Sequence, residues 1–227
     1  MPHKYCHKYN GNILYAIIKP EDEGLNQTSL LYIMSAGTSD SLPIENGSDL
    51  LIVLLYSQGA SGTINEPIEG ITRLQKLMFL LRQGIGPEKL VNIAESYGYK
   101  PYKMGPYSDD LNADIEELIS AGIIHSEQLK YWIHDDSDNS ADLDPDIDAP
   151  SIKKKKVISL KFSLTSPLGI EIGKDLWETL KKEDKAGMTK FKSFFNSLSL
   201  RQLLIFAYEK FPEFTTKSII KGQLGLG

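Results

Sequence analysis

The chain has 227 residues, of which 41% are hydrophobic, and a formal net charge of −5 at pH 7. This apolar content suffices for one sizeable core, or for a core with an appended helical unit. The modest acidity excludes a global field that would draw the chain to nucleic acid or to anionic membranes. One cysteine, Cys6, excludes an intrachain disulfide framework. No apolar run approaches the roughly 18–20 residues that span a bilayer. We therefore expect a cytoplasmic protein without a membrane partner.

Residues 1–45 form an N-terminal extension that differs from the rest of the chain. The stretches "NGNILYAIIKP" and "TSLLYIMSAG" are short and β-like, and a polar stretch separates them. Met34 opens "MSAGTSDSLPIENGSDLL", a polar lead into a helix. Two interpretations stay open. Either Met34 is the functional start and residues 1–33 are dispensable or non-native, or the extension is a genuine N-terminal hairpin.

Helical patterns begin after this extension. The apolar stretch 48–59 predicts a buried helix with Ser48 as its N-cap. Residues 70–84, "GITRLQKLMFLLRQG", repeat apolar side chains at helical spacing between glycines, which predicts a second helix. The pattern of residues 86–98 fits either a weaker helix or a loop.

The segment 104–124, "MGPYSDDLNADIEELISAGII", predicts a third helix that ends at Gly122. Gly105 and Pro106 fit a permissive cap followed by a first helical residue. Asp109 and Asp110 then fall in the first turn, where carboxylates favour the positive end of the helix dipole. The apolar positions recur at spacings that make one face, and they are Tyr107, Leu111, Ile115, Leu118 and Ile119.

Two strands are predicted next, at 123–136 and 153–165, because the second alternates apolar and polar residues. The loop between them is rich in aspartate and is predicted to be mobile. Further helices are expected after the strands. They are placed at 166–184, 188–198, 199–211 (with a capping box of Ser199 and Gln202) and, as a last turn or two, 215–222.

Three helices followed by a two-stranded ribbon is the winged-helix order. The sequence therefore predicts a mainly α (α+β) fold with a winged-helix-like three-helix core. The wing is two-stranded with an Asp-rich loop at 135–156, within a domain of residues 46–165. Residues 166–227 are expected to form a C-terminal helical unit.

Three motifs carry a resemblance to a known family. "GITRLQKLMFLL", "YKMGPYSDDLNADIEELISAGII" and "YEKFPEFTTKSII" resemble the YwgA-like family of small prokaryotic proteins, and more remotely the SocA-like antitoxin (Panacea) domain. The likeness covers about residues 46–221. It implies a winged-helix-like core with a helical C-terminal unit. For function it implies less, because only the antitoxin relatives are known as binding modules and not catalysts.

The predicted third helix is unsuited to reading DNA. Base edges are commonly read by Arg, Lys, Asn or Gln, and this helix offers only Asn112 of these types. Its exposed face would instead repel a polyanion. That face is either a solvated surface that keeps the helix soluble or a docking surface for a basic protein partner. The docking candidates are Asp109, Asp110, Glu116, Glu117 and Tyr107.

Basic candidates for nucleic-acid contact lie elsewhere in the chain. Cations of the second predicted helix and a lysine run beside the wing could meet phosphates. The aspartates of the wing loop can also neutralise that run, as in solubility or self-association. The candidates are Arg73, Lys76, Arg82, Lys153, Lys154, Lys155 and Lys156.

Signals for catalysis or cofactors are weak. The chain contains neither a phosphate-binding GxxxxGK[ST] loop, nor GxSxG, nor HExxH. The Asp-rich loop lacks the glycine and glutamate of an EF-hand, and no closed zinc site is apparent. We therefore expect no cofactor and no metal. The predicted function is a non-catalytic, protein-binding regulator or antitoxin-like adaptor that could also dimerise. The alternative is a DNA-binding regulator, and a small metal-dependent enzyme ranks third.

Overall fold

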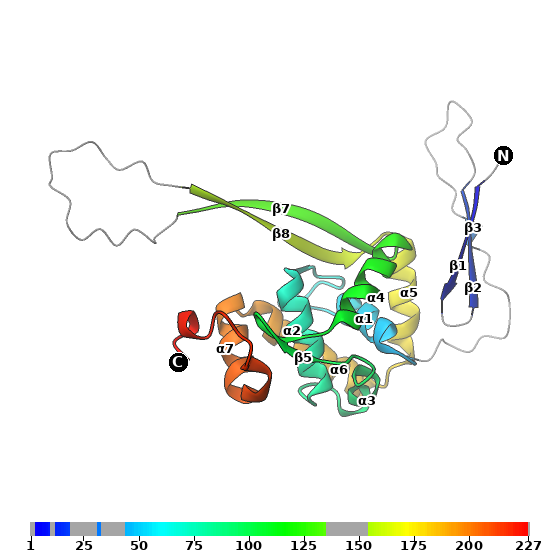
Figure 1. Ribbon diagram of the computed structural model, residues 1–227. Coiled ribbons are helices and arrows are strands. Elements are labelled where there is room, and N and C mark those ends of the chain that lie inside the picture. The colour runs from blue at the N-terminus through cyan, green and yellow to red at the C-terminus, as the bar shows by residue number, and fades with distance from the viewer. Residues whose placement is uncertain (1–2, 10–11, 19–30, 33–43, 135–153, 227) are drawn as a thin grey trace, which may run out of the picture. The chain divides into compact units, whose positions relative to one another are not determined.

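A computed structural model describes residues 3–9, 12–18, 31–32, 44–134 and 154–226 (Figure 1). The chain divides into two units, residues 1–41 and residues 42–227. Helices and small antiparallel sheets alternate along the chain, so the predicted α+β class is confirmed. Residues 166–227, which we expected to form a helical unit of their own, belong to the same unit as the preceding helices and sheet.

The first unit contains short antiparallel strands. β1 (His3–Tyr9) pairs with β2 (Asn12–Ile18) over their full lengths, and β3 (Leu31–Tyr32) pairs with the other edge of β2. The described strands are compatible with either interpretation of this region, so both stay predictions. Met34 lies outside the described residues, so the functional start at this residue stays a prediction.

Helix α1 (Gly47–Tyr56) is the buried helix predicted from its apolar sequence, but its cap differs from the prediction. Asn46, and not Ser48, is the N-cap. The Asn46 side chain accepts a hydrogen bond from the backbone N–H of Asp49, whose carboxylate accepts one from the N–H of Asn46. The helix is apolar around most of its circumference and packs against α5 (Leu168–Thr179).

A lysine from a distant helix closes the C-terminal end of α1. Lys192, on α6 (Lys182–Ser197), is fully buried. Its ammonium donates to the carbonyl oxygen of Leu55 at 2.7 Å and to that of Ser57 at 2.8 Å. The carbonyls at a helix C-terminus carry partial negative charge and lack partners within the helix. Lys192 therefore ties α6 to α1.

Helix α2 (Ile71–Arg82) confirms the second predicted helix. It is preceded by Gly70, whose φ of +91° is a conformation that glycine adopts without a steric penalty. The segment left open between helix and loop contains a 3₁₀ turn, Glu88–Leu90, and the short helix α3 (Val91–Ala94).

A hairpin precedes the acidic helix. β5 (Lys100–Tyr102) pairs antiparallel with β6 (Gly105–Tyr107). Gly105 and Pro106 therefore lie in a strand, and the prediction that they open the helix is wrong. The glycine–proline pair matched a helix start in sequence, but Gly105 has a φ of +82°, and Pro106 pairs with Pro101.

Helix α4 (Asp109–Ser120) begins directly after this hairpin. Ser108 is its N-cap, and the Ser108 hydroxyl accepts a hydrogen bond from the N–H of Leu111. The backbone of Ser108 also pairs with the buried side-chain amide of Gln75 on α2. The Ser108 N–H donates to Oε1 at 3.0 Å, and Nε2 donates to the Ser108 carbonyl at 2.9 Å. The start of α4 is thus fixed on α2.

The second unit also holds a three-stranded antiparallel sheet. Its strand order is β4–β8–β7, formed by β4 (Ile68–Glu69), β8 (Lys154–Leu164) and β7 (Ile124–His134). The two predicted strands are confirmed, whereas the short β4 was not predicted. The Asp-rich loop predicted to be mobile lies outside the described residues, which stop at 134 and resume at 154.

The C-terminal helices differ in their boundaries from the prediction. The helix expected over 166–184 is divided, because α5 ends at Thr179 and α6 begins at Lys182. The capping box of Ser199 and Gln202 at the start of α7 (Leu200–Lys210) is confirmed. The chain then continues through the 3₁₀ turns Pro212–Thr215 and Gly222–Leu224.

Helix α2 lies at the centre of the second unit. The Phe79 ring meets the rings of Tyr99, Phe211 and Phe214 edge-on, at centroid distances of 5.1, 5.1 and 4.8 Å. Segments that are distant in sequence thus share one aromatic cluster. In the part of the chain that the structure describes, no helix is both long enough and apolar enough to cross a bilayer.

We predict that Gln75→Leu lowers the free energy of unfolding by about 2–4 kcal/mol, because it leaves the buried N–H and carbonyl of Ser108 without partners. Denaturant unfolding would measure this loss. Gln83→Leu, at the end of the same helix, is the matched control, and it should change stability by less than about 0.5 kcal/mol. Equal effects of the two substitutions would contradict the role assigned to Gln75.

Candidate functional site

The exposed face of α4 is acidic, as the sequence indicated. Asp109, Asp110, Glu116 and Glu117 are exposed, and buried Leu, Ile and Leu side chains hold the opposite face against the core. Asp109 forms an ion pair with Lys100 of β5. In the described ranges, neither Glu116 nor Glu117 has a cationic partner. The helix therefore presents carboxylates that remain available to a partner.

One carboxylate of α4 has a structural role. Asp114, also on α4, is half-buried. It accepts hydrogen bonds from the Tyr97 hydroxyl at 2.7 Å and from the Ser48 hydroxyl at 2.6 Å. Burial and the hydrogen bond to Asp114 raise the pKa of Tyr97 well above its usual range, so the phenol stays a donor. Asp114 thus anchors α4 to α1.

The basic residues of α2 are not the free cations that the sequence suggested. Lys76 is only 2% exposed, and its ammonium donates to the carbonyl of Pro106 at 2.8 Å. Its assignment as a phosphate contact is therefore wrong for this structure, because the phosphate backbone of a nucleic acid cannot reach a side chain enclosed in the protein core. The position of Lys76 in the helical repeat suggested an exposed face. Other elements pack on both faces of α2, so the repeat alone does not show that Lys76 is buried.

The two arginines of α2 are half-buried and engaged. The Arg73 guanidinium donates to the carbonyl of Phe195 at 3.1 Å and to that of Asn196 at 3.4 Å. The Arg82 guanidinium lies 6.0 Å from the centroid of the Tyr99 ring, within the range of a cation–π contact. Arg73 thus ties α2 to α6, whereas the Nε of Arg82 is buried without a hydrogen-bond partner in the described part of the chain.

Lys76 and Lys192 are unusual as buried lysines. Burial lowers the pKa of each to about 7, since desolvation disfavours the charged ammonium. Nearby Glu66 opposes this effect at Lys192 without removing it. Both ammonium groups bond to backbone carbonyls rather than to carboxylates.

A pocket that the sequence did not predict lies between α2 and the β5–β6 hairpin. Its volume is about 250 Å³. The only signal in the sequence was a group of closely spaced tyrosines before α4, and the facing wall comes from distant segments. The lining residues are Ile71, Thr72, Gln75, Lys76, Tyr102, Lys103, Met104, Gly105, Tyr107 and Ile219.

Tyr107 connects this pocket to the acidic face of α4. Its ring lines the pocket and lies 5.0 Å from the ring of Tyr102. Partial burial, followed by the carboxylate of Asp109, raises the pKa of Tyr107, and Glu116 adds to the effect. The pocket and the carboxylates are therefore neighbours, and Tyr107 belongs to both.

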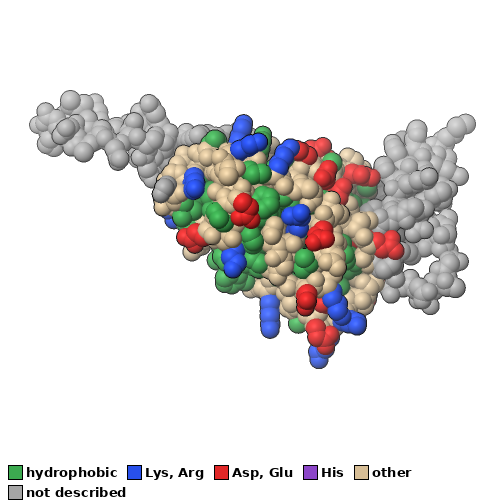
Figure 2. Space-filling model, turned by 60° about the horizontal axis from the view of Figure 1, so that its bottom comes forward, with side chains coloured by type: hydrophobic (Ala, Val, Ile, Leu, Met, Phe, Trp, Pro, Cys, Tyr) green, Lys and Arg blue, Asp and Glu red, His purple; other side chains and the backbone are tan. Residues whose placement is uncertain are grey.

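The lysine run at the start of β8 is only partly described. Lys153 lies outside the described residues, and the backbone of Lys154, Lys155 and Lys156 belongs to β8. These four candidates stay predictions. On the face seen in Figure 2, the described Lys and Arg side chains are interspersed with Asp and Glu, without a broad area of one sign. No group of three or more His, Cys, Asp or Glu suited to a metal occurs among the residues searched, which are those described.

No family model, curated protein or solved structure matches this chain. The resemblance of its motifs to the YwgA-like family therefore stays a prediction. In the structure, two of these motifs touch each other. Gln75 and Lys76 of "RLQKL" hold the backbone of Pro106 and Ser108 in "GPYS".

We predict that the protein becomes more stable as the pH rises from 6.5 to 9. The usual lysine pKa of 10.5 applies to the unfolded chain, whereas Lys76 and Lys192 titrate near 7 when folded. Between these values the unfolded state binds more protons, so the free energy of unfolding increases with pH. Each lysine should contribute roughly 2 kcal/mol by pH 9.

Denaturant unfolding at the two pH values measures this increase. Lys76→Met should remove about half of it, whereas Lys103→Met, a change at an exposed lysine of the same pocket, should leave it intact. A pH dependence unchanged by Lys76→Met would show that Lys76 is not responsible.

Proposed function

We propose that this chain is a non-catalytic, protein-binding module of winged-helix type. The succession α1, β4, α2, α4, β7 and β8, with α3 and the β5–β6 hairpin inserted between α2 and α4, supports this architecture. So does the strand order β4–β8–β7, in which the strand after the first helix pairs with the second strand of the wing. In a winged helix, the helix before the wing is the one that usually enters a DNA groove, and here that position is occupied by α4.

The acidity of α4 is the observation that carries the proposal. Four exposed carboxylates lie on this helix, only one of them is paired with a lysine, and the helix sequence contains neither Lys nor Arg. Like charges approaching across a short gap repel each other even after screening by salt. The same face would attract a basic protein surface and would speed its association. A toxin, a protease adaptor or a second copy of this chain could supply such a surface.

The state of α2 further weakens the DNA alternative. Lys76 is enclosed, Arg73 bonds to two backbone carbonyls, and Arg82 lies half-buried over the Tyr99 ring. A DNA-binding regulator would then rely on Lys153–Lys156 of the wing. These lysines could contact phosphates, but they would contribute little sequence discrimination.

We predict that the protein is not retained on random-sequence duplex DNA at about 50 mM salt, where phosphate contacts are strong. Retention at this salt with release near 200 mM would instead support the DNA-binding alternative. The measurement is elution from immobilised duplex, with binding of bovine serum albumin as the background.

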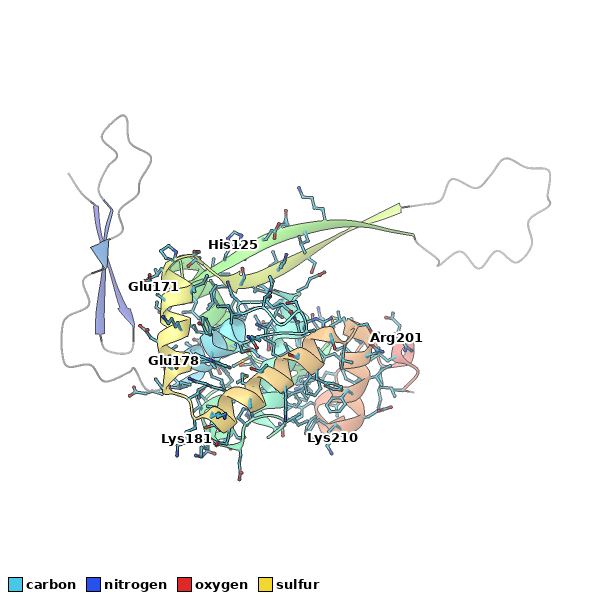
Figure 3. The ribbon with its side chains drawn as sticks, turned by 180° about the vertical axis from the view of Figure 1, so that it is seen from behind. His125, Glu171, Glu178, Lys181, Arg201 and Lys210 are labelled. Atoms are coloured by element: carbon cyan, nitrogen blue, oxygen red, sulfur yellow. The ribbon has the colours of Figure 1, made fainter. Side chains whose placement is uncertain are left out.

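The docking face is tested by reversing its charge. Glu116→Lys with Glu117→Lys should abolish cross-linking of partner proteins in extracts of the producing cells. Glu171→Lys with Glu178→Lys makes the same change in charge on α5 and should leave cross-linking intact (Figure 3). If both double variants behave alike, α4 is not the docking face.

A further inference from the structure

Strand β7 has an edge that no described strand covers. In the sheet order β4–β8–β7, β7 (Ile124–His134) is the last strand, and among the described strands it pairs with β8 alone. In an antiparallel pair, about every second residue of the outer strand directs its N–H and its carbonyl away from the neighbouring strand. This row of backbone donors and acceptors is a template for a further strand.

The other edge of the same ribbon, which consists of β7 and β8, is partly occupied. β4 pairs with Lys161 and Phe162 of β8, and the N–H of Gly70 donates to the carbonyl of Leu160 at 2.6 Å. A strand added to β8 would therefore meet β4, whereas the edge of β7 is open along its 11 residues in the described chain. The edge of β7 is thus the longer template.

The β7–β8 ribbon leaves the core along its length. Near the helices, Ile124 and Leu164 are buried, whereas further along Gln128 and Lys130 are exposed and Leu160 is 38% exposed. The distal end of the ribbon lies beyond the helices (Figures 1 and 3). A two-stranded ribbon is at best marginally stable in water unless a third strand or a packed face supports it. An added strand would supply this support.

The ribbon is basic. The two strands contain five lysines and one glutamate, so their formal net charge is +4 with histidine neutral. The glutamate, Glu127, already lies 3.8 Å from the ammonium of Lys161. Lys130 is exposed and belongs to no ion pair among the described residues. The excess of cations favours an acidic strand at this edge, since opposite charges on neighbouring strands attract.

From these observations we propose that the free edge of β7 binds an extended, acidic segment of a protein partner as an additional strand. The main chain of the segment bonds to the β7 backbone, and its Asp or Glu side chains lie beside Lys130. The sequence of β7 also contains Leu129, Tyr131, Trp132 and Ile133, so β-branched or aromatic residues are expected between the acidic ones. This surface is separate from the acidic face of α4 and takes a partner of opposite charge.

The test is a selection of random dodecapeptides displayed on phage, with the full chain as immobilised bait. Enriched peptides should combine Asp or Glu with Val, Ile, Thr or Tyr. A synthetic copy of one such peptide should slow hydrogen exchange at the backbone amides of β7 but not at those of α4. If no acidic peptide is enriched, the proposal is wrong, and the lysines serve only to keep this edge from pairing with other chains.

N-methylation of the synthetic peptide shows whether it binds as a strand. Methyl groups on every second nitrogen, in the frame that faces β7, remove the donors and should weaken binding more than about tenfold. Methyl groups in the other frame point away from β7 and should leave binding intact. If both frames have the same effect and duplex DNA displaces the peptide at about 50 mM salt, the ribbon attracts any polyanion and the proposal is overturned.

Variants of the chain locate the site. Lys130→Glu reverses a charge beside the added strand and should weaken binding of the synthetic peptide about fivefold. Lys190→Glu makes the same change at an exposed lysine of α6 and should leave binding unchanged. Thermal unfolding would check that both variants fold. Equal binding by the two variants would contradict the site on β7.

This inference and the proposed function can fail separately. Glu116→Lys with Glu117→Lys should abolish cross-linking to a basic partner but should not weaken binding of the acidic peptide. If the cross-linking result holds and the peptide tests fail, the docking face of α4 stands and the inference about β7 is wrong. Sedimentation of the chain alone adds a last check. A dimer that the peptide dissociates would show that a second copy occupies β7, which would overturn the proposal of a separate partner.

Discussion

The contact between two neighbouring side chains of α2 and the backbone before α4 organises this protein. Gln75 acts like a strand neighbour toward Ser108, exchanging one donated and one accepted hydrogen bond, and Lys76 adds a third bond to Pro106. All of these groups are buried, so losing any one would leave a polar atom without water or partner. This contact fixes the direction of α4 and the wall of the pocket together. The acidic face and the apolar pocket are therefore parts of one rigid arrangement.

Local patterns in the sequence predicted the elements well where a single physical signal dominates. The repeat of apolar residues located α2, and the pairing of Ser199 with Gln202 located the start of α7. The glycine and proline before α4 misled, because a strand end with positive φ uses the same residue types as a helix start. The helix start at Ser108 is set in part by Gln75, which lies 33 positions earlier in the sequence and bonds to the Ser108 backbone. A contact over this distance in sequence cannot be predicted from local patterns.

The site was less predictable than the fold for a related reason. The acidic face of α4 follows from helical periodicity, and the exposed positions agree with it. Lys76 reads as a surface lysine in a basic helix, and only the packing of a hairpin over it makes it part of the interior. The pocket could not be predicted, since its walls join residues near 72, 104 and 219. The sequence thus predicted the acidic face of α4 but not the pocket between α2 and the β5–β6 hairpin.

The bond from Lys192 to the end of α1 bears on how this protein can be shortened. A fragment that stops after β8 would lose Lys192, and the carbonyls of Leu55 and Ser57 would lose the ammonium that donates to them. The same cut would remove α5, which covers the apolar surface of α1. The helices after β8 are thus part of the same core as α1, and we expect a fragment that ends at β8 to be unstable.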